Sequence, residues 1–587
     1  MLSVLTDPNP LLVKSLRARM RWAHVLSWGV VTLTLTLFVS MVIYLPLVYR
    51  EGVPSGDAAK AVIPAVLIIQ AVILMFLGTG SVAYGISMER DEGLVEYQRM
   101  TPMSPTAKIL GYLFGLPARE YVLVAMTMPI LGWAVLESGF SVVTILHFYL
   151  IFFSSVWVYH LTALTAGMVS PMPRMTALVS MGLVFVLYFV LPNLSRLGIP
   201  FFEHLTIRPI LFGLVWEELP EQWRFRAEAS GIDRARPIPW FGVSLNQTVY
   251  ALLAQGFVIG VMYSVLRRRW IRENCHLFSK ASGVVAYAGV LVFMLSSLWA
   301  IMVQDEVYEA VFAPRFNSAE FVDGQWIRTM RNPNEPVARD AENLMALLFV
   351  TIGLMGVMYL CMTTWLTASR HTAVEGWRRA MKLGRERLGW NSDSATSLPA
   401  CLLMLCLSMA ATWLVLDLAA SDHGYYERMP TARGMVLPVL AVLGCGLFVQ
   451  GLCERLGGLV FAVGLFLIWM IPLFVGVILM AAFSQLDLSM LVAMPCPPVP
   501  VFSAVAMMLE TATPLPGMEP GDFVPDDEFA SFRAIATAGG YAYFAAGLGV
   551  QVWRHLYRRR VRRIGLGERA DRTSWLDADM PEQSEEF

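Results

Sequence analysis

Long hydrophobic runs alternate with short polar segments along most of the chain. A helix needs about 20 apolar residues to cross the hydrocarbon core of a bilayer, and about twelve runs reach that length. The pattern therefore predicts an all-α fold, a polytopic bundle of transmembrane helices. The predicted spans are residues 24–48, 61–87, 109–136, 141–168, 173–193, 245–266, 283–303, 343–367, 398–419, 435–453, 457–483 and 534–554.

In two hydrophobic segments, prolines interrupt the helical pattern too often for an ordinary transmembrane span. The stretch 488–510 holds Pro495, Pro497, Pro498 and Pro500 and precedes the last span. The stretch 194–211 precedes the sixth span in the same way. Irregular backbone at membrane depth is tolerated only where protein or water shields it. We therefore interpret 488–510 as a re-entrant or interfacial segment.

Composition supports a membrane protein. Hydrophobic residues make up 56% of the 587 positions and charged residues only 15%, with a mean hydropathy of +0.58. Soluble proteins carry about 25% charged residues because their whole surface faces water. The seven cysteines form no CxxC pair, and the pattern indicates neither a disulfide framework nor a metal site. No basic motif is interleaved with aromatic residues, so we expect no nucleic-acid partner.

Basic residues near the span ends set the expected orientation. If the N-terminus is cytoplasmic, the basic clusters fall on the cytoplasmic side, and an even number of spans returns the C-terminus to that side. The first expected partner is then the lipid bilayer, whose anionic headgroups attract these clusters. The clusters lie at residues 14–21, 267–280, 370–387 and 554–563.

A basic amphipathic helix is predicted near the start of the chain. Asn9 is a favoured N-cap residue, and Pro10 suits the first helical position. Leu12, Leu16 and Met20 then share one face, as in a helix lying in the membrane interface. A plain membrane anchor and a more specific role both stay open for this helix. Its basic residues lying mostly on other faces include Lys14, Arg17 and Arg21.

The loop after the second span, residues 87–108, is unusually charged for this chain. Gly93 interrupts it, and Thr101-Pro102 followed by Ser104-Pro105 ends it with two helix-starting signals. Such a loop is either a solvated connector or a docking surface for a soluble partner. Its charged residues are Glu89, Arg90, Asp91, Glu92, Glu96 and Arg99, which we expect to crowd into about one and a half helical turns.

These segments resemble the signature of type-2 ABC exporter permeases, the transmembrane subunits of ATP-binding cassette transporters. That family typically shows an elbow helix opening with Asn-Pro, an "ERE-x-GT" run, an "L-x-x-TP-x-S" turn and a "GK" start to the next span. The resemblance is clearest over residues 8–280 and departs from the pattern at Ser15, Leu94 and Tyr112. The matching segments are 9–21, 89–93, 100–105, 108–111, 241–242, 267–269 and 277–280.

The resemblance implies a multi-pass permease subunit of an ATP-driven exporter in the cytoplasmic membrane of a bacterium. It implies that loop 87–108 docks on a separate cytoplasmic ABC ATPase, and that periplasmic or membrane co-subunits can join the complex. The implied coupling residues are Glu89, Arg90, Glu92, Gly93, Arg99, Thr101 and Pro102. The implied elbow-helix residues are Asn9, Pro10, Lys14, Arg17 and Arg21.

The sequence contains no GxxxxGK[ST] P-loop, the motif whose backbone cradles nucleotide phosphates. We therefore expect the chain not to be an enzyme, to bind no cofactor directly and to draw on ATP through its partner. No catalytic residue and no metal ligand is predicted.

About twelve spans suggest two fused halves of roughly six helices each. Residues 1–280 would be the permease-like core, 281–566 a degenerate repeat and 567–587 an acidic cytoplasmic tail. The loop after the eighth span occupies the same ordinal place as loop 87–108. Its second coupling-loop candidates are Glu375, Gly376 and Arg378. A single permease core with an unrelated extension is the alternative.

Three other functions compete with the exporter. An ion-coupled secondary transporter needs acidic groups at matched depth in its spans. Isolated polar residues in the predicted spans include His147, His160 and Asp417. We expect these residues to face other helices or an interface and to pack with a hydrogen-bonded partner. A membrane enzyme acting on lipids needs a cluster of reactive side chains at one face, and none has suitable spacing. A non-transporting scaffold needs no chemistry at all. The transported substrate does not follow from the sequence.

Overall fold

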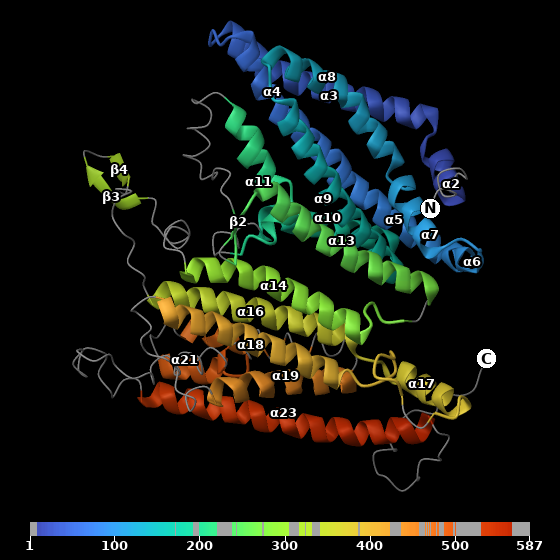
Figure 1. Ribbon diagram of the computed structural model, residues 1–587, viewed down its shortest axis with the longest axis vertical. Helices are drawn as coiled ribbons and strands as arrows, with labels where there is room; N and C mark the ends of the chain where they lie inside the picture. The colour runs from blue at the N-terminus through green and yellow to red at the C-terminus, as the bar shows by residue number, and fades with distance from the viewer. Residues whose placement is uncertain are drawn as a thin grey trace. The chain divides into compact units, whose positions relative to one another are not determined.

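The computed structural model forms two compact units (Figure 1). The first unit comprises residues 1–277 and 292–337, and the second comprises 278–291 and 338–587. The residues described are 9–170, 172–191, 199–219, 238–241, 243–272, 275–303, 316–322, 325–330, 341–385, 388–422, 436–456, separate helical positions between 464 and 479, and 486–496, 499–500 and 530–565.

The first unit is helical, with two short antiparallel ribbons. Its larger helices are α2 (Pro10–Arg19), α3 (Trp22–Tyr49), α4 (Ser55–Ala71), the π-helical η1 (Val72–Leu77), α5 (Gly78–Asp91), α6 (Leu94–Met100), α7 (Pro105–Gly115), α8 (Ala118–Ser138), α9 (Val142–Val169), α10 (Pro173–Phe189) and α13 (Gln247–Ile271). The short elements are η3 (Glu203–Leu205), α11 (Arg208–Ile210), η4 (Leu211–Val215), η5 (Trp216–Glu218), β1 (Ile238–Trp240), β2 (Val243–Leu245), β3 (Phe316–Val322) and β4 (Gln325–Met330). In the ribbons, Ile238 pairs with Leu245 and Val322 with Gln325.

The secondary structure described in the second unit is helical. The helix α14 (Lys280–Val303) begins in this unit and ends in the first. The remaining helices are α16 (Ala341–Leu366), α17 (Arg370–Lys382), α18 (Leu398–Asp422), α19 (Val436–Leu456), α21 (Leu486–Ala493) and α23 (Ala530–Gly565).

Among the described residues, six helices are long and apolar enough to span a membrane. They are Trp22–Tyr49, Ser55–Asp91, Ala118–Ser138, Val142–Val169, Gln247–Ile271 and Val436–Leu456. The predicted helical, membrane-like character is therefore confirmed. Shorter apolar helices lie at Pro173–Phe189, Lys280–Ser296, Leu354–Leu366 and Leu398–Leu414. A total of about twelve spans stays a prediction, and the tail 567–587 lies outside the described residues.

The predicted third span, 109–136, is not one continuous helix. The helix α7 ends at Gly115, and α8 begins at Ala118. Pro117 between them has no amide hydrogen with which to continue the backbone ladder. The separate helix α7 packs against α2.

The core of the first unit is built on α9. Ile151, Phe148 and Phe152 are fully buried there, and the two phenylalanine rings stack with centroids 5.7 Å apart. The broken segment 199–219 belongs to the same core, because Ile207, Ile210 and Val215 are buried in it.

Two buried backbone carbonyls of this broken segment accept hydrogen bonds from helix side chains. The Leu205 carbonyl accepts hydrogen bonds from Ser155 at 3.3 Å and Tyr159 at 2.8 Å. The His204 carbonyl accepts one from Gln255 at 3.0 Å. Irregular backbone is stable inside an apolar bundle only with such partners.

The lone histidines of α9 have different surroundings. His160 is buried, and its Nε2 lies 3.1 Å from the Leu74 carbonyl in the π-helical turn. This agrees with its predicted packing role. His147 is exposed on the helix surface, so it does not pack inside the bundle, and its expected position at an interface stays a prediction. The side chain of Asp417 lies outside the described residues.

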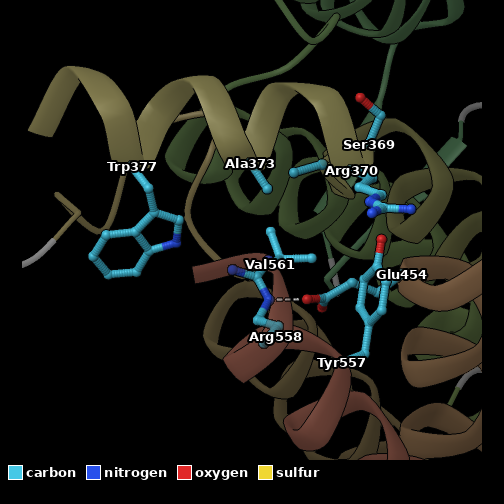
Figure 2. A pocket seen from close by; sticks show the side chains of 9 residues that line it. Ser369, Arg370, Ala373, Trp377, Glu454, Tyr557, Arg558 and Val561 are labelled. Atoms are coloured by element: carbon cyan, nitrogen blue, oxygen red, sulfur yellow. Dashed lines mark hydrogen bonds and ion pairs between the residues drawn. The ribbon is translucent and has the colours of Figure 1, made fainter. Parts of the chain in front are cut away.

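In the second unit, α17 lies along the C-terminal part of α23 (Figure 2). The Trp377 ring on α17 lies 5.1 Å from the Arg562 guanidinium on α23. Gly376 faces inward, and a Cβ atom there would meet Ser394 at 2.0 Å. The helix is therefore fixed to its own unit by one face.

The helices α19 and α23 run side by side in the same direction (Figure 1). Leu437 lies against Gly540, and Gly444 lies against Gly547 seven residues further along each helix. A Cβ atom at Gly547 would meet the Gly444 carbonyl oxygen at 2.5 Å. Small residues of this kind let helix backbones approach closely in a membrane.

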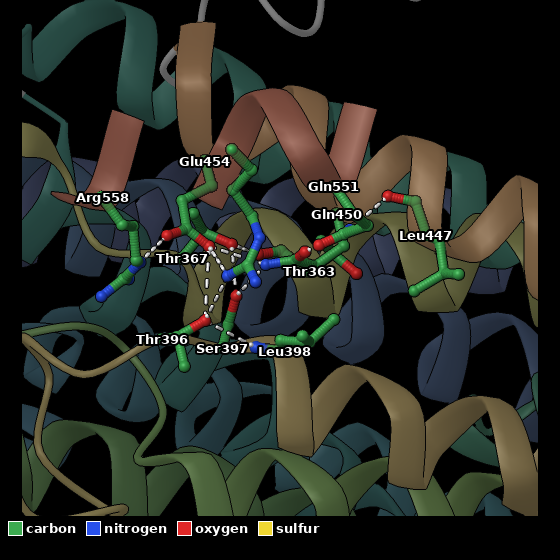
Figure 3. A network of polar contacts seen from close by, with 11 residues as sticks. Thr363, Thr367, Thr396, Ser397, Leu398, Leu447, Gln450, Glu454, Gln551 and Arg558 are labelled. Carbon is green, nitrogen blue, oxygen red and sulfur yellow. Dashed lines mark hydrogen bonds and ion pairs between the residues drawn. The ribbon is translucent and has the colours of Figure 1, made fainter. Parts of the chain in front are cut away.

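A buried polar network closes this helix pair at one end (Figure 3). Glu454 of α19 binds Arg554 of α23 at 3.3 Å and also forms an ion pair with Arg558. Gln450 donates to the same carboxylate at 2.8 Å, and the Arg554 guanidinium reaches Thr396 at 2.9 Å. The network joins α19 and α23 to the start of α18.

Candidate coupling site

The helix α2 forms as its sequence predicts. The side-chain oxygen of Asn9 accepts hydrogen bonds from the amides of Leu11 at 3.0 Å and Leu12 at 3.4 Å, and Pro10 occupies the first position. The side-chain nitrogen of Asn9 also donates to the Ala107 carbonyl of α7 at 2.6 Å. One residue thus starts α2 and attaches it to α7.

Two glycines of α7 provide the surface on which α2 rests. A Cβ atom at Gly111 would meet Leu11 at 2.9 Å, and one at Gly115 would meet Ser15 at 2.6 Å. Ser15 is buried, which gives a physical reason for a small residue where the resembling family usually has glutamate.

The role of Asn9 as the N-cap of α2 can be tested by substitution. We expect Asn9→Ala to cost about 1–2 kcal/mol, because two amide donors lose their acceptor. Hydrogen–deuterium exchange in α2 should then rise. Ser104→Ala is the matched control, because Ser104 caps α7 through the Ala107 amide and does not reach α2. Unchanged exchange in α2 of Asn9→Ala would contradict this role.

Gly93 divides the charged loop into two helices. It adopts φ = +73°, the left-handed conformation that glycine adopts readily, between the end of α5 and the start of α6. Gly93 therefore breaks the charged pattern as expected, but the charged residues extend over the ends of two helices and not over one turn and a half. Glu89 and Arg90 belong to the last turn of α5, whereas Glu96 and Arg99 belong to α6.

Glu89 is the point at which α2, α5, α6 and α7 meet. Its carboxylate pairs with Lys14 at 3.0 Å and accepts a hydrogen bond from Gln98 at 3.1 Å. The Tyr112 hydroxyl contacts both this carboxylate and the Gln98 side-chain oxygen. The Tyr112 ring stacks on Trp270 of α13 at 5.7 Å, so five helices join through few residues.

Arginine and lysine side chains hold the opposite side of α6. Arg99 reaches the Arg269 carbonyl of α13 at 3.4 Å, and its guanidinium pairs with Glu96 at 3.4 Å. Lys108 is buried and donates to the Thr101 carbonyl at 3.3 Å. Burial and the neighbouring Arg99 lower the pKa of Lys108. These contacts place α6 rigidly on the bundle.

The outer face of α6 is apolar and exposed. Leu94 is 37% exposed, Tyr97 66% and Met100 78%. Spaced three residues apart, they form one stripe along the helix, which we call the α6 stripe. Asp91 and Glu92 are exposed next to it.

The structure separates the predicted coupling residues into two groups. Glu92 and Pro102 are exposed beside the α6 stripe, and Gly93 forms the exposed turn. Thr101 bonds back to the Gln98 carbonyl at 2.6 Å. Glu89 and Arg99 are half-buried and make contacts that hold α6, and Arg90 is half-buried in the last turn of α5.

The α6 stripe was not predicted, because charge was the signal that selected the contact residues of loop 87–108. The available signal was an apolar residue at every third position within a polar loop.

The predicted elbow residues are likewise divided. Asn9 and Lys14 contact α7 and α5, while Pro10, Arg17 and Arg21 are exposed. In the second predicted loop, Glu375 pairs with His371 at 3.5 Å and Arg378 is exposed. Gly376 is buried, so it serves the packing of α17.

The described residues contain no group of three or more histidine, cysteine, aspartate or glutamate side chains that could hold a metal ion. No protein-family model, curated protein or solved structure matches this chain.

Proposed function

We propose that this chain is the membrane-spanning permease subunit of an ATP-driven ABC exporter, located in the cytoplasmic membrane of a bacterium. Its energy would come from a separate cytoplasmic ATPase that docks on residues 87–108. Both termini would then be cytoplasmic. The motif resemblance and the six apolar helices that could span a membrane support this proposal.

The observation that carries the proposal is the α6 stripe. Leu94, Tyr97 and Met100 are exposed in the charged loop 87–108, where a soluble partner can reach them. Exposed apolar side chains that form one patch favour a protein interface. Exposed Asp91 and Glu92 provide the polar rim that such interfaces have.

The rigid support of α6 explains how docking could be used. The helix is connected to α2 and α7 through Glu89 and to α13 through Arg99. A partner that pushes on α6 would therefore move several helices of the first unit together. Coupling of this kind requires a contiguous network of packed side chains and hydrogen bonds.

The second unit has a comparable element, which supports two related halves. In the first unit, α6 follows the second predicted span and reaches α13 through Arg99. In the second unit, α17 follows the predicted eighth span and packs on α23 through Trp377. We propose α17, with exposed Arg378, as a second cytoplasmic contact region.

Removing the α6 stripe should release the ATPase. We expect Tyr97→Ser combined with Met100→Ser to reduce co-purification of a P-loop ATPase at least tenfold, because truncating central aromatic anchors typically costs 2 kcal/mol or more. The measurement is quantitative mass spectrometry of proteins retained on the purified chain.

Tyr49→Ser is the control, since Tyr49 is 82% exposed at the far end of α3. Equal ATPase recovery from the double variant and the control would contradict the proposed docking. ATPase binding without ATP-driven flux in proteoliposomes would favour the scaffold.

A further inference from the structure

The broken segment 199–211 lies between the predicted spans 173–193 and 245–266 and packs against α10 and α13. Side-chain hydrogen bonds attach its irregular backbone to the bundle. The helix α9 donates two of them to the Leu205 carbonyl, and α13 donates one to the His204 carbonyl. The proposed docking of an ATPase on α6 makes no use of this segment.

His204 is buried at the centre of this attachment. The residue is 4% exposed, and its ring lies edge-on to the Tyr250 ring of α13 with the ring centres 4.9 Å apart. Its Nδ1 lies 2.9 Å from the Pro200 carbonyl, and because a carbonyl only accepts, Nδ1 must carry the hydrogen. A neutral imidazole has one such hydrogen, so Nε2 keeps its lone pair. This Nε2 is buried without a hydrogen-bond partner in the described part of the chain.

Gaining a proton at Nε2 would give this buried ring a positive charge. Burial lowers the pKa of His204 from 6.5 to about 4, and the hydrogen bond to Pro200 opposes this effect only in part. Because the pKa in the attached segment lies below its ordinary value, the neutral imidazole stabilises the attachment. This stabilisation is complete above about pH 6.5 and is lost as the pH falls from 6.5 towards 4.

Other titratable or charged side chains also contact this segment. Tyrosines are neutral and arginine is charged at both pH 7 and pH 5. Glu203 is a carboxylate that can gain a proton in acid, so the test must separate it from His204. Among the described residues, these contacts are made by Tyr159 of α9, Tyr188 of α10, Tyr250 of α13, Glu203 of η3 and Arg208 of α11.

We infer that segment 199–211 is an acid-sensitive latch, which His204 holds closed while its imidazole is neutral and opens when Nε2 gains a proton. In the open state the imidazolium reaches water, and the hydrogen bonds from α9 and α13 to the segment are broken. The inference does not depend on the proposed transport function, because the segment and its sensor belong to one unit and are measured without ATP or an ATPase.

The test is hydrogen–deuterium exchange of the full chain in detergent at pH 7 and pH 5, corrected for the pH dependence of intrinsic exchange. The amides to follow are those of residues 204–208 and 211, which are hydrogen-bonded in the closed segment. A pKa that rises from about 4 to 6.5 on opening makes the open form about twentyfold more populated at pH 5 than at pH 7. Exchange of these amides should rise by about that factor, and exchange of residues 148–152 in the core should not.

Two variants at His204 identify the sensor. His204→Asn keeps a donor near the Nδ1 position for the Pro200 carbonyl but cannot gain a proton. Its corrected exchange should agree within about twofold at the two pH values. His204→Phe, which keeps a ring against Tyr250, should give the same ratio and serves if the asparagine variant folds poorly. His147→Phe is the matched control, because His147 is exposed on α9, and it should keep the pH dependence of the unmodified chain.

Three results would overturn the inference. The first is equal or slower corrected exchange at pH 5 in residues 204–208 of the unmodified chain. The second is an unchanged pH dependence in the His204 variants, which would assign the response to another group such as Glu203. The third is a parallel rise in residues 148–152, which would indicate that acid unfolds the whole unit and opens no local latch.

Discussion

Glu454→Ala is expected to lower the free energy of unfolding by about 3–5 kcal/mol, the usual cost of removing one partner of a buried ion pair. The side chain of Glu454 is only 2% exposed, and those of Arg554 and Arg558 are 10% and 21% exposed. Without the carboxylate, two largely buried guanidinium groups lose their shared counter-ion. Thermal unfolding of the detergent-solubilised chain measures the loss.

Glu375→Ala is the matched control for this prediction. Glu375 is partly exposed on α17 and pairs with exposed His371 at 3.5 Å, so its removal should change stability by less than about 0.5 kcal/mol. Glu454→Gln should fall between the two variants, because it keeps hydrogen-bonding atoms without the charge. If Glu454→Ala unfolds at the same temperature as Glu375→Ala, the network in Figure 3 does not stabilise the fold.

Gly547→Ala is expected to destabilise the second unit by about 1–3 kcal/mol through overpacking. The added Cβ atom would lie 2.5 Å from the Gly444 carbonyl oxygen, and backbone cannot move aside as a flexible side chain can. The helices α19 and α23 must therefore separate. The midpoint of thermal unfolding, together with the yield of folded protein, reports the effect.

Gly549→Ala separates packing from helix propensity. Gly549 lies two residues further along α23, and a Cβ atom there would meet nothing within 4 Å. Alanine is the better helix former, so this change should be neutral or stabilise by up to about 1 kcal/mol. Similar unfolding temperatures for the two alanine variants would exclude close packing as the reason for Gly547.

Local signals in the sequence were sufficient for several elements. Asn9-Pro10 predicts the start of α2 because a cap acts within one helical turn. Gly93 predicts the turn after α5 because its conformation depends on its own backbone. The length of the apolar runs predicts five of the six long helices, since crossing a bilayer requires a minimum length, whereas the predicted span 109–136 is divided at Pro117.

Contacts between distant residues were not predictable from local signals. Glu89 was predicted to contact a partner, but Lys14, Gln98 and Tyr112 from three other helices bind it. Gly376 was predicted in a docking loop, but Ser394 covers it. A helix surface in one sequence does not reveal which face another segment will cover.

The measurement that tests the central claim most directly is photo-cross-linking from Tyr97 in native membranes. A benzoylphenylalanine at this position, 66% exposed in the α6 stripe, should attach to a protein carrying a GxxxxGK[ST] P-loop. The same probe at Tyr49, at the far end of α3, should not. Cross-links from Tyr97 only to lipid or to proteins without a P-loop would contradict the claim that an ATPase drives this chain.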